Sequence, residues 1–128
     1  MATRALPVGL LLLTLVMDGQ GRHQTGFVVL VLALASTAAG ALSAFGDLVD
    51  LPGRAPGVAA ARLETFCLCL GAAFVLVAAA ARAQADAAAG VPALGVSGIV
   101  GALMLMCPVL FASAVRTAAP LLRRAQAR

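Results

Sequence analysis

The sequence contains no tryptophan and no tyrosine, and charged residues make up only 11% of its 128 positions. Hydrophobic residues account for 62% of the chain. A soluble domain of this length leaves much of its surface in water and has no room to bury so large an apolar fraction. The scarcity of charge therefore excludes an ordinary soluble domain, and it favours a protein whose helices are solvated by lipid.

Nucleic acid is excluded as a partner, although the net charge is +4. Proteins that bind single-stranded nucleic acid use aromatic side chains on which the bases stack. Of phenylalanine, tyrosine and tryptophan, this chain contains only five phenylalanines. Lysine is absent, and the arginines separate apolar blocks instead of forming a basic stripe. The one dense basic cluster is in the C-terminal tail, at Arg116, Arg123, Arg124 and Arg128. We expect this tail to contact anionic lipid headgroups.

Four apolar blocks predict an all-α fold, a polytopic transmembrane helical bundle that forms one membrane domain over residues 1–128. The expected spans are residues 3–19, 25–45, 63–81 and 92–115, followed by a basic cytoplasmic tail at 116–128. The apolar part of the first block is short, because its thirteen residues rise about 20 Å against a hydrocarbon core of roughly 30 Å. The alternative for this block is the apolar segment of a signal peptide, although no small-residue cleavage site follows it.

The arginine positions predict an orientation with both termini in the cytoplasm. In this orientation only Arg22 and Arg82 lie on the outer side, and the other seven arginines are cytoplasmic, as the positive-inside rule requires. Arg62 and Arg82 frame the third span, so we expect each side chain to extend to an interface. A composition rich in alanine, glycine and arginine, without lysine, is typical of a GC-rich genome, so we expect this multi-pass protein in a bacterial cytoplasmic membrane. The alternative is a eukaryotic organelle or plasma membrane.

Small residues recur every three or four positions in the second and fourth spans. This spacing lets helix backbones approach each other closely within a membrane. The predicted helix-packing residues are Ser36, Gly40, Ala44, Ser97, Gly98, Gly101 and Ala102. Pro108 lies inside the fourth span, where its missing N–H predicts a kink.

Carboxylates are few, and three of them border the cytoplasmic ends of the second and third spans. An ionisable group inside a bilayer is expensive and therefore a functional candidate by default. Asp47, Asp50 and Glu64 are expected at the wet interface, where they are weak functional candidates. Glu64 is the first choice among them because it lies nearest the uncharged run of the third span. On the outer side, Asp18, Arg22 and His23 form a small polar group.

Sulfur ligands for Cu(I) are present in Cys67, Cys69 and Cys107, with Met104 and Met106 near the last of them. Residues two apart on a helix point about 200° apart, so Cys67 and Cys69 do not face one ion. We therefore predict no metal site and no cofactor. No histidine or carboxylate lies at the depth of the span serines to activate a hydroxyl nucleophile, so the chain is not expected to be an enzyme.

The leading prediction is an accessory or structural subunit that packs against partner helices in a larger membrane complex. Since tryptophan and tyrosine anchor most membrane proteins at the interfaces, their absence favours association with other helices. The expected partners are membrane lipids and other transmembrane helices. The alternative is a homo-oligomeric channel or transporter for small solutes. A third hypothesis is an intramembrane enzyme or redox protein that uses the cysteines.

Overall fold

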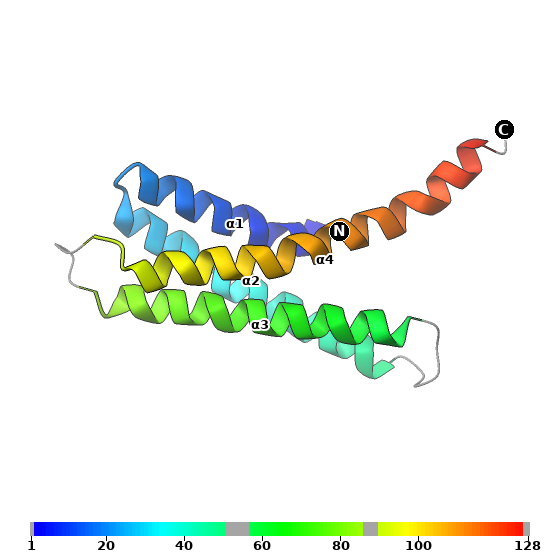
Figure 1. The fold of residues 1–128 in the computed structure, drawn as a ribbon, viewed down its shortest axis with the longest axis horizontal. Coiled ribbons are helices and arrows are strands. Elements are labelled where there is room, and N and C mark those ends of the chain that lie inside the picture. Colours follow the sequence, from blue (N-terminus) through cyan, green and yellow to red (C-terminus); the bar gives the residue numbers. More distant parts are fainter. Residues whose placement is uncertain (1, 51–56, 86–89, 127–128) are drawn as a thin grey trace.

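The computed structural model describes the backbone of residues 2–50, 57–85 and 90–126, and the side chains of residues 5–50, 57–85 and 90–115. Within these ranges the chain forms four helices and no strand: α1 (Ala2–Gly19), α2 (His23–Asp50), α3 (Val58–Ala83) and α4 (Ala93–Gln126). Figure 1 shows the helices as an up-and-down bundle in which consecutive helices run in opposite directions. The all-helical fold expected from the sequence is confirmed.

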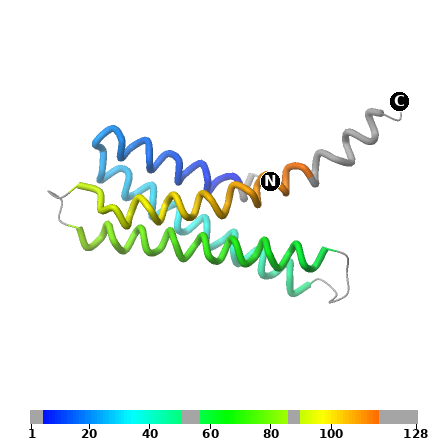
Figure 2. The backbone as a smooth tube through the Cα atoms, in the orientation of Figure 1, coloured from blue at the N-terminus to red at the C-terminus, as the bar shows by residue number. Residues whose placement is uncertain are grey.

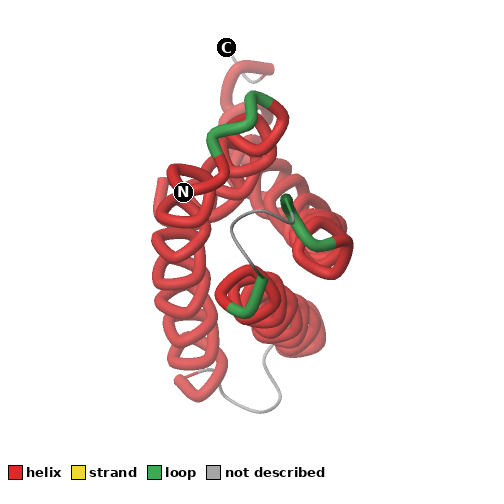
Figure 3. The backbone as a smooth tube through the Cα atoms, turned by 90° about the vertical axis from the view of Figure 1, so that its left-hand side faces the viewer, coloured by secondary structure: helices red, strands yellow, loops and turns green. Residues whose placement is uncertain are grey.

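The helices form a ring, since α1 packs on α2, α2 on α3, and α3 on α4, while α1 contacts α4 much less extensively. The tube view shows the same order along the chain (Figure 2). One end of the bundle, where α1 and α3 finish and α2 and α4 start, is called the hairpin end below; it is the end that faces the viewer in Figure 3.

At the hairpin end, glycine and proline set the helix boundaries. After α1, Gly21 has a φ of 74°, its N–H donates to the Asp18 carbonyl at 3.0 Å, and the Arg22 N–H donates to the Met17 carbonyl at 2.9 Å. These two bonds form a Schellman motif, which needs a left-handed residue at the glycine position. Pro92 immediately precedes α4, and its carbonyl accepts hydrogen bonds from Gly95 and Val96. Proline suits a helix start because it has no N–H to satisfy.

The bundle core is built from small and medium apolar side chains at helical spacing. On α2 the buried positions are Gly26, Leu30, Ala33, Thr37, Ala41 and Ala44. Their spacing of three and four residues places them on one face of the helix. The fully buried side chains Leu11, Val75 and Ile99 show that the other three helices reach the same core. The described core is thus mostly apolar, with a few buried polar side chains such as Thr14 and Thr37.

Large apolar side chains also cover the exterior, such as Leu42, which is 73% exposed. By length and composition α2, α3 and the Ala93–Val115 part of α4 are each suited to cross a membrane, whereas the apolar helix Ala5–Gly19 is shorter. An exterior of this kind in water would be a very large apolar patch, so lipid or protein must cover it. Three of the helices thus have the length and composition of membrane spans, as in a small helical membrane protein.

Candidate functional site

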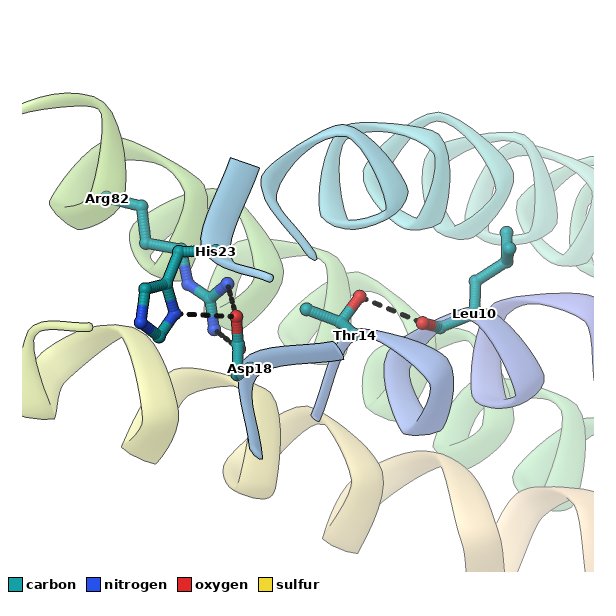
Figure 4. Close-up of polar contacts among 5 residues, drawn as sticks. All are labelled: Leu10, Thr14, Asp18, His23 and Arg82. Atoms are coloured by element: carbon teal, nitrogen blue, oxygen red, sulfur yellow. Dashed lines mark hydrogen bonds and ion pairs between the residues drawn. The ribbon is translucent and has the colours of Figure 1, made fainter. Parts of the chain in front are cut away.

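A buried ion pair joins α1 to α3 at the hairpin end. Arg82 donates from Nη1 to Oδ1 of Asp18 at 3.1 Å and from Nη2 to Oδ2, so the two groups meet in a bidentate arrangement (Figure 4). Only 5% of the Arg82 side chain and 10% of the Asp18 side chain are exposed. A paired guanidinium and carboxylate satisfy each other's charge, which is what permits both to lie among packed helices.

This ion pair spans the ring. Among the described residues the backbones of α1 and α3 do not approach each other, so the pair connects two helices that are otherwise separated. Glycines on the other two helices leave the necessary room. A Cβ at Gly26 of α2 would lie 2.6 Å from Asp18 Oδ1, and a Cβ at Gly95 of α4 would lie 3.2 Å from Arg82 Nε. All four helices therefore contribute to the geometry of one charged contact.

Two further polar features belong to this site. His23 Nδ1 lies 3.8 Å from Asp18 Oδ1, and the His23 side chain is 48% exposed (Figure 4). At 3.8 Å this contact is a weak one whose attraction depends on protonation of the imidazole. Arg82 Nε is buried and has no hydrogen-bond partner. The hairpin end thus holds one strong ion pair, one half-exposed imidazole and one donor whose hydrogen-bonding capacity is unused.

A cavity of about 440 Å³ lies beside the ion pair. Arg82 forms part of its wall, together with His23 and Gln24 from the start of α2 and Pro92 from the start of α4. The remaining wall is mostly apolar, with Phe27 as its largest side chain. Buried charge and open space therefore adjoin at the hairpin end.

The sequence placed Asp18 and His23 together but paired them with Arg22, which is exposed. Arg82 was expected to extend to an interface, and it instead turns into the bundle to bind Asp18. The sequence signal was available in principle: Asp18 and Arg82 have opposite charge and end the first and third blocks, so both fall on the same predicted side. Only the packing of the four helices determines that these two side chains meet.

At the opposite end of the bundle, Glu64 is buried, with 9% of its surface exposed, whereas Asp47 and Asp50 are exposed. The neighbouring Thr65 hydroxyl lies 3.2 Å from the Ala44 carbonyl of α2 and 2.9 Å from the Ala61 carbonyl of its own helix. A hydroxyl shared in this way links α3 to α2. The three carboxylates do not form one cluster with the hairpin-end site, and their functional role stays a prediction.

The predicted packing residues fall into two groups. On α4, Gly98 and Ala102 are buried, and a Cβ at Gly98 would lie 2.9 Å from the Phe74 carbonyl oxygen and 3.0 Å from Ala78 Cβ. Gly101 faces the Phe74 ring, while Ser97 is exposed.

On α2, Ala44 is buried and Ser36 is half-buried. Gly40 is also half-buried, and a Cβ there would meet nothing within 4 Å. Among the predicted packing residues, those that bring two helices close together therefore lie between α3 and α4, and Gly40 faces open space.

An open apolar groove of about 550 Å³ follows the outward face of α4. The side chains that line it are Val100, Leu103, Met104, Cys107, Pro108 and Phe111. Pro108 lies within the helix, which continues past it, and the later part of α4 leads away from the other helices (Figure 1). Met104 and Phe111 are among the most exposed apolar side chains, at 72% and 73%.

The sulfur groups are divided between the core and this groove. Met106 is buried against Gly71, whereas Met104 and Cys107 lie on the exposed side. Across residues 5–50, 57–85 and 90–115, no three histidine, cysteine, aspartate or glutamate side chains gather as metal ligands would. The side chains of the tail arginines, Arg116, Arg123, Arg124 and Arg128, lie outside the described residues.

No protein family, curated protein or solved structure was found to match this chain.

Proposed function

We propose that this protein is a non-enzymatic accessory or structural subunit that binds a partner transmembrane helix in a larger membrane complex. The observation that carries the proposal is the outward groove of α4, whose six lining residues are all apolar. Their positions repeat at intervals of three and four, so they form one continuous stripe on the helix. A stripe of this kind is the surface on which a second helix packs lengthwise.

The chemistry at Pro108 favours a protein helix over an acyl chain as the occupant of this groove. Because proline has no N–H, the Met104 carbonyl lacks its usual backbone donor four residues later. A hydroxyl or amide on a partner helix can supply that donor, and a hydrocarbon chain cannot. Gly40 on α2 offers a second place where another backbone can approach closely.

The proposed topology has four spans with both termini in the cytoplasm, in a bacterial cytoplasmic membrane. The distribution of arginines supports this orientation, since the hairpin end then faces outward with Arg22 and Arg82, and the basic tail meets anionic lipid inside. The short α1 crosses as the first span. Its polar end at Asp18 is satisfied by Arg82 and does not have to reach water.

The test uses the cysteines already present. Cys107 lies in the groove and Cys69 is exposed on α3, so two variants that each retain one of these cysteines form a matched pair. Both are labelled in native membranes with a thiol-reactive photo-crosslinker and irradiated, and the adducts are identified by mass spectrometry. We expect the Cys107 variant to give a discrete adduct with one other membrane protein, and the Cys69 variant to give at least tenfold less of it.

The outcomes separate the alternatives. An adduct between two copies of this chain at Cys107 supports the homo-oligomeric channel or transporter, whose pathway would then form between copies. Solute flux through liposomes that contain only this chain supports the same alternative. Adducts with no protein at either cysteine overturn the accessory role.

A further inference from the structure

The cavity at the hairpin end has the size and composition of a small-molecule site. Its volume of about 440 Å³ falls within the range of roughly 300–1,000 Å³ that is usual for ligand pockets. Such pockets are mostly apolar and contain a few polar groups that fix the orientation of the ligand. This cavity is separate from the α4 groove, because none of its lining residues is shared with that groove.

The lining is amphipathic. Polar groups come from His23, Gln24 and Arg82, while Phe27 and Pro92 contribute apolar surface. A ligand that fits both parts has an apolar body and one polar end. A fully polar solute would leave the apolar wall covered only by water, and a pure hydrocarbon would cover the His23 and Gln24 side chains without offering them a hydrogen bond.

Charge determines which polar end is accommodated. The positive charge of Arg82 is already neutralised by the bidentate contact with Asp18, so an anion would have to displace a buried carboxylate. A neutral oxygen acceptor does not compete with Asp18. Both His23 and Gln24 line the cavity and can donate a hydrogen bond to such an acceptor.

The flank of the bundle gives access to this cavity. Val28 lines it and is 58% exposed, so the apolar side of the cavity adjoins the surface that lipid covers. His23 is half-exposed at the polar side. A molecule dissolved in the bilayer can therefore reach the cavity with its apolar part towards the membrane and its polar end towards the end of the bundle.

We infer that this cavity binds a neutral amphiphile that presents a carbonyl oxygen to His23 and Gln24, beside the Asp18–Arg82 pair, and places its apolar body against Phe27, Val28 and Pro92. Two sources supply this chemistry. One is the ester carbonyl of a membrane phospholipid, and the other is a free lipophilic carbonyl compound such as a quinone. The site does not depend on the partner helix proposed for α4.

Fluorescence tests the inference without interference, because the chain contains no tryptophan. Phe27→Trp places a single fluorophore in the cavity wall, and Phe111→Trp places one on the lipid-facing groove of α4 as a control. Each purified variant in detergent is titrated with phosphatidylcholine brominated on its acyl chains and, separately, with a short-chain ubiquinone. We expect saturable quenching of the cavity variant by one of these probes, at a mole fraction at least tenfold below that required for the control.

The polar end is tested by replacing His23 and Gln24 with alanine in the Phe27→Trp background, which leaves the Asp18–Arg82 pair intact. Loss of their hydrogen bonds is expected to weaken saturable binding by about fivefold or more. Saturation by brominated lipid alone identifies a phospholipid as the ligand, and saturation by the quinone alone identifies a free carbonyl compound. Val28→Trp repeats the measurement in case the larger ring at position 27 fills the space. The inference is overturned if neither cavity variant shows saturable quenching, or if the alanine replacements leave it unchanged.

Discussion

The ion pair at the hairpin end should contribute strongly to the stability of the bundle. Two unit charges 3.1 Å apart attract by about 5 kcal/mol at an effective dielectric constant of about 20. Much of this attraction offsets the cost of removing both groups from water, so the pair as a whole contributes less. Removal of one partner is different, because it leaves the other charge buried without compensation.

We predict that Asp18→Asn and Arg82→Gln each lower the free energy of unfolding by about 3–5 kcal/mol, or roughly 10²- to 10⁴-fold in the folding equilibrium. The double variant Asp18→Asn/Arg82→Gln has no isolated charge and should lose much less than the sum of the single losses. Steric trapping in bicelles, which reports the unfolding equilibrium of a membrane protein, measures all three. Arg62→Gln is the control, since Arg62 is an exposed arginine near the other end of α3, and it should cost about 0.5 kcal/mol or less.

The double-mutant cycle measures the interaction between Asp18 and Arg82 directly. A coupling energy of about 2 kcal/mol or more is expected for two groups in direct contact. Additive losses, or an Arg82→Gln loss no larger than that of Arg62→Gln, would refute the reasoning, because they would mean that Asp18 and Arg82 act independently of each other. Circular dichroism of each variant checks that the helices are retained.

Two glycine predictions follow from the same geometry and use the same assay. Gly98→Ala should destabilise the bundle by about 1–3 kcal/mol, because its Cβ would lie 2.9 Å from the Phe74 carbonyl oxygen. Gly40→Ala has open space around its Cβ and should stabilise the bundle by up to about 1 kcal/mol through helix propensity. Equal effects at the two glycines would contradict the α3–α4 packing. Gly26→Ala should cost about 1–3 kcal/mol because its Cβ would lie 2.6 Å from Asp18 Oδ1, and this loss should vanish in an Asp18→Ala background. A loss that persists without the Asp18 carboxylate would show that Gly26 serves some other contact.

Much of the fold follows from patterns that a single chain displays. Long uncharged blocks leave a helix as the only way to satisfy backbone groups in lipid, and the glycine and proline positions mark where each helix stops or starts. Gly21 and Pro92 are examples of such boundaries. The small residues of the fourth block were recognisable as packing candidates before any geometry was known, because their spacing alone places them on one face.

The hairpin-end site is harder to predict from the sequence. Asp18 and Arg82 are separated by 64 positions and lie on helices that are not consecutive. Periodicity assigns each to the end of a helix, but it contains no information about which helices lie across the ring from each other. The sequence does not show why positions 26 and 95 are glycine, because these two residues leave room for side chains from other helices.

Composition and the length of the apolar blocks are enough to indicate a small helical protein suited to lipid, because they control how a chain is solvated. Contacts between helices set three other features: Arg82 turns inward to Asp18, Gly98 is in close contact while Gly40 is not, and a cavity adjoins the ion pair. These features depend on distances of a few ångströms between helices, and such distances come from the packing of all four helices together rather than from any one of them.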